Sequence, residues 1–249
     1  MGGVRVFRPA DINDAFKNYY TFLYRQPEAA IPESLGDYLH LLLLRTLALE
    51  DRDPLGGPVT LEEVKDAITQ SAGKAPGTDG LPMEFYKKYS NILAPLLVEL
   101  YAEAFQRGSL PDSKREALVV PLPKLESREV SVSDFRPLSI LNCDFKILSK
   151  ILASRLVQHI SNLIHDDQNG LIPARDTSLN LRRLFALLHM PQAETPPGAV
   201  LLSIDFEKAY DSIRWDYLRT VMLRMGLGEG WVRWVDLLYA TGGPVTYGG

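Results

Sequence analysis

The segment from Leu201 to Asp211 carries the most distinctive chemistry in the sequence. Its apolar run, Ala199–Phe206, predicts a buried strand that places the carboxylate of Asp205 near the strand's C-terminal end. Burying an unpaired carboxylate is expensive, so we expect Asp205 to meet a cation or a set of hydrogen-bond donors. Mg²⁺ is such a cation, because it prefers oxygen ligands, often one or two carboxylates together with substrate phosphates. The alternative interpretation is that Asp205 caps the turn after the strand.

Two neighbours of Asp205 carry weaker signals. Asp211 lies beyond a predicted turn, so we expect it to form a local cap or an ion pair rather than to be a second metal ligand. Tyr210, five residues after Asp205, is by itself typical of a core aromatic residue. Spacing alone therefore predicts one metal-binding carboxylate.

Helices must supply most of the scaffold that positions this carboxylate. The periodicity of apolar residues predicts helices over residues 10–23, 36–49, 145–164, 177–189, 214–225 and 230–240. Thr60 and Glu63 form the capping-box pattern at the start of a helix over residues 61–71. Pro82 is placed to open a further helix, which we expect to break near Pro95.

Strands and breaker residues complete the scaffold. The cluster of Asp, Pro and Gly at residues 53–58 predicts a boundary. Ala117–Val120, followed by Pro121 and Pro123, predicts a short strand with Ser139–Leu141 as its partner. Helices, a small sheet, more helices and then a buried strand predict an α+β fold rather than a strict βαβ alternation.

Composition excludes several classes of protein. The 249 residues are 46% hydrophobic and 23% charged, which permits a sizeable core and excludes global disorder. The net charge of −4 excludes a uniformly basic surface, so nucleic-acid binding would need a local patch. The single cysteine, Cys143, excludes an internal disulfide and fits a reducing, intracellular compartment. The most apolar stretch, residues 39–49, is too short to span a membrane, so we expect no membrane contact.

Residues Ile204–Ile213, followed by Trp215, resemble the first catalytic motif of reverse transcriptases from non-LTR retrotransposons of the long interspersed element type. The resemblance implies that Asp205 is the catalytic aspartate and binds Mg²⁺. It also implies that the main-chain carbonyl of Phe206 adds a metal contact. Tyr210 would then be the steric gate that excludes the 2′-OH of ribonucleotides.

Two further blocks, Val120–Lys124 and Asp134–Asn142, resemble the fingers hairpin of the same family. The resemblance implies that Lys124 and Arg136 grip the triphosphate of the incoming dNTP. The chemistry fits, because lysine acts as a point charge and arginine as a planar fork for phosphate oxygens.

The backbone around Arg136 is restricted, because Pro137 favours an extended conformation for the residue before it. The alternative interpretation of Arg136 is an ion pair with Asp134 or Glu129. On the following helix, Lys146, Lys150 and Arg155 predict either a basic edge along nucleic acid or a solvated face.

Residues Gly73–Pro82 resemble the family's N-terminal signature. The resemblance implies that Lys74 meets a phosphate of the RNA template, and a solvated lysine is the alternative. Pro76 followed by Gly77 predicts a turn in which Gly77 supplies a positive φ. Without the resemblance, this block is a rigid loop between helices.

Residues Asp167–Arg175 resemble the block that holds the template in the family. The implied template contacts come from Gln168, Gly170 and Arg175. The sequence departs from the family pattern, which has Phe and Gly where this chain has Leu171 and Ala174. Ala174 restricts the backbone if a positive φ is needed there.

The resemblance runs from about residue 12 onward and implies helix-rich polymerase fingers, with a small antiparallel sheet and an incomplete right-hand palm. We expect a helical N-terminal extension over residues 1–58, a fingers-like region over 59–190 and a partial palm over 191–249. The implied partners are an RNA template, a DNA primer and a dNTP.

The family's further catalytic aspartates come from an Asp-Asp turn, and no adjacent aspartates follow Asp205 in this sequence. Two-metal phosphoryl transfer needs more than one carboxylate. We therefore expect a fragment of the polymerase domain that is inactive on its own. The alternatives are a reused RNA- or protein-binding module without chemistry, and a phosphoacceptor role for Asp205 in an α/β enzyme.

Overall fold

The computed structural model of the protein describes residues 7–25, 33–42, 44–73, 75–124, 131–189, 200–239 and 245–247. The α-helices are α1 (Pro9–Leu23), α2 (Glu33–Leu41), α3 (Leu49–Gly56), α4 (Leu61–Gln70), α5 (Met83–Lys88), α6 (Ser90–Arg107), α7 (Asp112–Arg115), α8 (Cys143–Leu163), α9 (Ser178–Leu188), α10 (Trp215–Arg224) and α11 (Gly228–Tyr239). The strands are β1 (Ala117–Pro123), β2 (Phe135–Leu141) and β3 (Val245–Tyr247), and a 3₁₀ turn, η1 (Val132–Asp134), precedes β2. The fold is α+β, as the sequence predicts.

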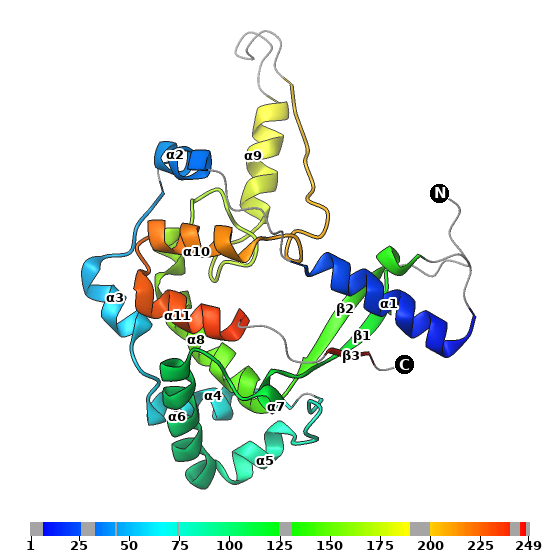
Figure 1. Ribbon diagram of the computed structural model, residues 1–249. Coiled ribbons are helices and arrows are strands. Elements are labelled where there is room, and N and C mark those ends of the chain that lie inside the picture. Colours follow the sequence, from blue (N-terminus) through cyan, green and yellow to red (C-terminus); the bar gives the residue numbers. More distant parts are fainter. Residues whose placement is uncertain are drawn as a thin grey trace.

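The main core surrounds α8, the longest helix. Its fully buried residues are Ile147, Leu148, Ile151 and Leu152. They join one hydrophobic cluster with side chains from α3, α4, α5, α6, α10 and α11. In Figure 1 these helices form the body of the molecule, while the sheet and α1 lie to one side of it.

A second, smaller core lies between α1 and the sheet. Phe16 and Tyr20 of α1 pack with Val119 of β1, and Phe135 of β2 lies against them. The sheet order is β2-β1-β3, with β1 and β2 antiparallel and β3 parallel to β1. The predicted pairing of the first two strands is confirmed, with Ala117 opposite Leu141.

Most predicted helices are confirmed, and α4 begins as the capping box requires. The amide of Thr60 donates to Glu63 at 2.8 Å, and the amide of Glu63 donates to the Thr60 hydroxyl at 3.3 Å. The predicted break near Pro95 is wrong, because α6 runs through it and the break lies at Tyr89 (φ −109°, ψ 23°). Pro95 is tolerated because it and Asn91, whose carbonyl it leaves unbonded, both lie on the exposed side of α6.

The single helix predicted over residues 36–49 is wrong: α2 ends at Leu41 and α3 begins at Leu49. Tertiary contacts override the local periodicity between them. The Leu47 amide donates to the carbonyl of Met225 at 2.8 Å, and the Arg45 side chain turns to Asp166. The predicted boundary at 53–58 starts later than expected, since α3 continues through Pro54 to Gly56.

The backbones of α3 and α11 approach each other closely at Gly56. A Cβ at this position would lie 2.7 Å from the amide nitrogen of Trp231, so only glycine fits. The indole of Trp234 then donates to the carbonyl of Gly57 at 3.0 Å. This hydrogen bond joins the C-terminal end of α3 to α11.

The buried strand predicted over Ala199–Phe206 is wrong for its described part. Residues 200–206 have no regular secondary structure, and their side chains are exposed, with Ile204 at 70% and Phe206 at 77%. Among the described strands, none lies beside this stretch to pair with its backbone. A strand needs such a neighbour to satisfy its amides and carbonyls, and the apolar sequence does not replace it.

Candidate functional site

The β1–β2 hairpin presents two cations on one face. Leu122 lies opposite Arg136 in the register, so their side chains share a face, and Lys124 follows two residues later on the same side. Alternate residues, including Val119 and Phe135, point to the other face, which α1 covers. Lys124 and Arg136 are both exposed on the uncovered face.

The predicted ion pair between Arg136 and Asp134 is not formed. The carboxylate of Asp134 instead accepts from the amide of Ser131 at 2.8 Å, closing the 3₁₀ turn before β2. The ammonium of Lys124 donates to the carbonyl of Ser133 at 3.1 Å, which holds it over the same turn. Glu129, the other proposed partner, lies outside the described residues. Among the described residues, no carboxylate pairs with the Arg136 fork.

We call residues 200–211 the catalytic segment, since it contains Asp205, for which the resemblance implies a catalytic role. The carboxylate of Asp205 is exposed, and the described residues give it neither a hydrogen-bond donor nor an ion-pair partner. Because the exposed carboxylate of Asp205 stays hydrated, it does not need a hydrogen bond from the turn that follows it. Tyr210 is 79% exposed, so its interpretation as a core aromatic residue is wrong. The local cap or ion pair expected for Asp211 is also not found among the described residues.

Lys208 ties the catalytic segment to α1. Its ammonium donates to the hydroxyl of Tyr19 and lies 4.5 Å from the centre of the Tyr19 ring. The backbone of Lys208 is left-handed, with φ of 49°, and its carbonyl accepts from the amide of Ser212 at 3.0 Å. Sequence analysis did not identify Tyr19, because an aromatic residue on an amphipathic helix is normally part of a core.

The residues present fit a Mg²⁺ ion only loosely. Among the described residues, no three His, Cys, Asp or Glu side chains gather closely enough to hold a metal ion. Asp205 offers one hydrated carboxylate, and the Phe206 carbonyl lies next to it in the chain. Mg²⁺ can be held by one carboxylate when substrate phosphates supply further oxygens. This arrangement suits an ion that arrives with a nucleotide, and not a preformed protein cage.

The turn after residue 73 is built against Asn142, at the start of α8. The Gly80 amide donates to the Gly77 carbonyl at 3.1 Å, and the positive φ lies at Gly80 (71°). The positive φ predicted at Gly77 is therefore wrong. Gly77 is needed instead for close approach, because a Cβ there would lie 2.6 Å from the Asn142 amide nitrogen. Lys74 lies outside the described residues.

The side chain of Asn142 is fully buried and joins three segments. It accepts from the amide of Asp79 at 3.3 Å and donates to the carbonyl of Ser113 at 2.9 Å. The contact with residues 77–79 connects the N-terminal signature to the fingers hairpin. The sequence places Asn142 at the end of the block that resembles the fingers hairpin, but it does not indicate a role for this side chain.

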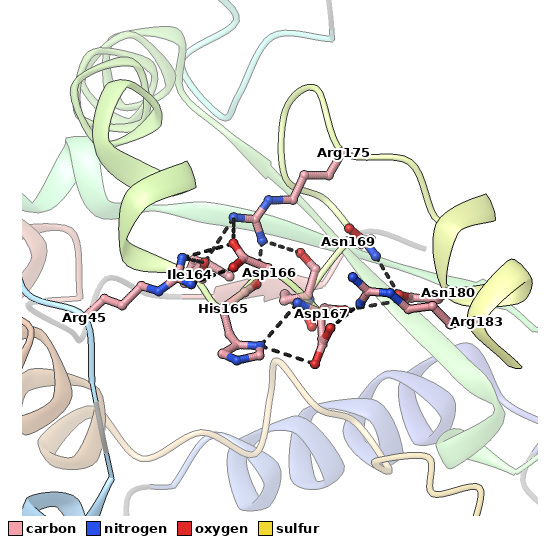
Figure 2. Close-up of polar contacts among 10 residues, drawn as sticks. Arg45, Ile164, His165, Asp166, Asp167, Asn169, Arg175, Asn180 and Arg183 are labelled. Carbon is pink, nitrogen blue, oxygen red and sulfur yellow. Dashed lines mark hydrogen bonds and ion pairs between the residues drawn. The ribbon is translucent and has the colours of Figure 1, made fainter. Parts of the chain in front are cut away.

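We call residues 164–176 the α8 loop, because it leaves the C-terminal end of α8. The guanidinium of Arg175, whose side chain is 14% exposed, donates at 2.5 to 3.0 Å to four carbonyls. The four carbonyls belong to Ser161, Ile164, His165 and Gln168. Figure 2 shows Arg175 above this turn, with Arg45 approaching from the other side. A template contact from Arg175 would have to compete with these bonds.

Arg45 and Asp166 reinforce the α8 loop. The two nitrogens of the Arg45 fork donate to the two Asp166 oxygens at 3.1 and 2.8 Å. The hydrogen bond from Arg45 holds the pKa of the Asp166 carboxyl below its ordinary value. Bidentate pairs of this kind add geometric specificity to the attraction.

Two residues of the α8 loop that depart from the family pattern have left-handed backbones. Leu171 and Ala174 each have φ of 62°. Position 174 therefore does adopt a positive φ, the conformation in which alanine restricts the backbone. Beside them, the Gln168 side chain donates to the carbonyl of Gly170 at 3.3 Å, so these two predicted template residues lie in this strained turn.

The three basic residues of the predicted edge of α8 lie in two different environments. The Lys146 ammonium donates to the Ala75 carbonyl at 2.9 Å, and Lys146 and Lys150 line a cavity of about 570 Å³ between α8, β2 and residues 71–83. Arg155 is buried at 9% exposure, so neither a nucleic-acid edge nor a solvated face describes it. Its guanidinium binds Glu63 at 2.6 Å and the carbonyl of Gly57 at 2.8 Å.

Burial alone would raise the pKa of the Glu63 carboxyl, but hydrogen bonds from Arg155 and Thr60 outweigh it and lower that pKa. The charged form of Glu63 is therefore the one that the fold stabilises. Buried Arg155 thereby fixes the start of α4 to α8.

The hairpin cations Lys124 and Arg136 and the exposed Asp205 lie within one continuous stretch of the chain, and this stretch can be compared with known families. The model of the family described as reverse transcriptase (RNA-dependent DNA polymerase) matches residues 122–246, which include every one of these groups. The chain belongs to the reverse transcriptase family.

The relatives place the chain among non-LTR retrotransposon reverse transcriptases. It is 31% identical to a transposon TX1 uncharacterized 149 kDa protein of Xenopus laevis, over 94% of this chain and 18% of that protein. It is 28% identical to an RNA-directed DNA polymerase from mobile element jockey of Drosophila melanogaster, over 62% of this chain and 17% of that protein. A Pol polyprotein from the R2 element of Popillia japonica is 27% identical, over 70% of this chain and 23% of its own length.

The chain thus spans about a fifth of the length of these relatives. In the part of the chain that the structure describes, no helix combines the length and the apolar composition needed to cross a membrane.

Proposed function

We propose that this chain supplies the nucleotide-gripping hairpin and the first catalytic aspartate of an RNA-directed DNA polymerase. The observation that carries the proposal is the register of β1 and β2, which places Lys124 and Arg136 on the same uncovered face. Two adjacent cations that pair with no carboxylate among the described residues are suited to a triphosphate, which carries several negative oxygens in a row. The family match does not favour the alternative of a reused binding module without chemistry.

Each residue has a separate task in this proposal. The Arg136 fork and the Lys124 point charge bind phosphate oxygens of the dNTP. Asp205 and the Phe206 carbonyl would hold Mg²⁺, which neutralises charge on the phosphates when it is bound. The exposed ring of Tyr210 would exclude a ribose 2′-OH.

The template contacts belong to the same proposal. Gln168 and Gly170 lie in the strained turn of the α8 loop, which offers polar groups to an RNA strand. Lys74 would add a phosphate contact, and the bonds that Arg175 makes to its own chain give it a role in holding the turn in shape. A DNA primer would be extended next to Asp205.

Incorporation of a nucleotide needs more than binding. The two-metal mechanism uses ions about 3.5–4 Å apart, clamped by more than one carboxylate. Among the described residues, Asp205 belongs to no group of three or more His, Cys, Asp or Glu side chains that could hold a metal ion. We therefore propose that this chain binds a dNTP with Mg²⁺ and does not incorporate it alone, as a primer-extension assay on an RNA template would show.

Calorimetric titration of the chain with dGTP and Mg²⁺ tests the proposed hairpin site. A charge-assisted hydrogen bond contributes about 1.5–3 kcal/mol, so Arg136→Ala should weaken binding by roughly ten- to a hundredfold. Arg182→Ala is the matched control, since Arg182 is an exposed arginine of α9 that is distant in sequence from the hairpin. Equal binding by the wild type and Arg136→Ala would refute the assignment.

A further inference from the structure

We propose that Tyr19 is a positioning residue for the catalytic segment and acts through Lys208. Helix α1 would then couple the hairpin that carries Arg136 to the segment that carries Asp205. The contact between Tyr19 and Lys208 is a feature of the structure. Its expected effect on dNTP binding rests on the proposed function.

The first half of the coupling is the packing of α1 on the hairpin. The ring of Phe16 meets the ring of Phe135 edge-on, with centroids 4.9 Å apart and planes at 84°. Phe135 directly precedes Arg136 in β2. The fully buried Tyr20 fixes the rotation of α1 about its axis, which determines where the neighbouring Tyr19 points.

The second half is the contact between Tyr19 and Lys208. One ammonium group makes two interactions with one side chain, a hydrogen bond to the hydroxyl and a cation–π contact at 4.5 Å from the ring centre. Such a pair restrains the lysine more closely than an ion pair in solution does, because the ring limits its approach to one face. Figure 1 shows the end of α1 beside the turn of the catalytic segment.

The backbone of Lys208 shows that the contact restrains the segment. A lysine with φ of 49° occupies a left-handed conformation that costs free energy for any residue with a Cβ. Such conformations persist where the surroundings over-determine them. Lys208 lies three residues after Asp205 and two before Tyr210, so fixing it fixes the turn between the metal ligand and the steric gate.

Nuclear magnetic resonance of the chain with ¹³C-methylated lysines detects the contact directly. The Tyr19 ring should shift the Lys208 signal away from those of the exposed lysines, and Tyr19→Leu should abolish this shift. Tyr19→Phe, which keeps the ring, should retain most of it. Phe22→Leu is the matched control, because Phe22 is an α1 aromatic residue that is 81% exposed. A Lys208 signal without a ring-current shift in the wild type would overturn the proposal.

Titration with dGTP and Mg²⁺ then tests the positioning role. A cation–π pair of this exposure corresponds to roughly a two- to fivefold effect, so Tyr19→Leu and Lys208→Gln should each weaken binding by that factor. The double variant should be no weaker than either single one, because both remove the same interaction. Tyr19→Phe should recover part of the affinity. Unchanged binding in Tyr19→Leu, with Arg136→Ala still impaired, would overturn the inference and leave the proposed function intact.

Hydrogen exchange decides the inference if the wild type binds no dGTP, a result that would refute the proposed function alone. In that case, the Ser212 amide, which donates to the Lys208 carbonyl, should exchange faster in Tyr19→Leu than in the wild type or Phe22→Leu. Equal exchange in all three proteins would overturn the positioning role.

Discussion

The α8 loop and the catalytic segment are both irregular, and both carry residues that the sequence marks as functional, yet they are held in different ways. In the α8 loop, Arg175 alone donates to four carbonyls, and Arg45 binds Asp166 through both oxygens. In the catalytic segment, the apolar side chains around Asp205 are exposed, and Lys208 provides the described polar link to α1.

The difference shows what irregular backbone needs in order to be fixed. The α8 loop replaces missing helix bonds with hydrogen bonds from side chains, four of them from Arg175 in its own sequence and others from the distant Arg45, so side-chain hydrogen bonds define its shape. The catalytic segment has the composition of a buried strand, but a strand is defined by its neighbours. The shape of the α8 loop is therefore fixed by a few arginine side chains, and the shape of the catalytic segment is fixed by the elements that pack on it.

The largest loss in the free energy of unfolding is expected in the helical body that surrounds α8. Leu148 is fully buried in α8, so Leu148→Ala should lower the free energy of unfolding by about 3–4 kcal/mol, through lost burial and a cavity. Urea denaturation measures the change. Val157→Ala on the same helix, at a half-exposed position, should cost less than about 1 kcal/mol. Similar losses for both variants would contradict the assigned core.

Removal of the Arg175 side chain should damage the α8 loop almost as much. Arg175→Ala removes four hydrogen bonds, although the Ile164 carbonyl keeps its bond from Arg45 and the His165 carbonyl keeps its bond from the Gln168 amide, so we expect a loss on the order of 2–3 kcal/mol in the free energy of unfolding. Arg183→Ala is the control, because Arg183 forms an exposed ion pair with Asp167 that contributes under about 1 kcal/mol. If Arg175→Ala unfolds at the same urea concentration as the wild type, the loop is not held by this residue.

The strain at Ala174 offers a prediction of opposite sign. Its φ of 62° favours glycine, so Ala174→Gly should stabilise the protein by about 0.5–1 kcal/mol. Ala153→Gly, at an exposed position inside α8, should instead destabilise it by about 1 kcal/mol. Thermal unfolding of the two variants gives the sign, and a destabilised Ala174→Gly would show that the left-handed conformation is not adopted.

The smallest effect is expected in the catalytic segment. Ile204 is 70% exposed, so Ile204→Ser should change the free energy of unfolding by no more than about 0.5 kcal/mol. The same urea experiment applies. A loss comparable with that of Leu148→Ala would mean that the segment is buried, and the contrast between the two regions would disappear.

Local sequence patterns predicted the parts of the fold that depend on local chemistry. The capping box of Thr60 and Glu63 identified the start of α4, and the strand pair of the hairpin followed from an apolar run with β-branched residues just before Pro121. The restriction expected at Ala174 if a positive φ is needed there came from the family pattern, which has glycine at this position, and Ala174 does have a positive φ.

Long-range contacts decided the parts that local patterns did not reach. The helix predicted over residues 36–49 is interrupted where Arg45 turns to Asp166, 121 residues away. Gly77 is required by the approach of Asn142, and not by its own φ. The buried position of Arg155 and the link from Tyr19 to Lys208 likewise depend on partners distant in sequence.

The side-chain Nε–Hε resonance of Arg136, followed by nuclear magnetic resonance during addition of dGTP and Mg²⁺, tests the central claim most directly. If the hairpin grips the triphosphate, this signal should shift in proportion to bound nucleotide while that of Arg182 stays unchanged. Saturation with dGTP that leaves the Arg136 signal in place, or a failure to bind dGTP at all, would contradict the account.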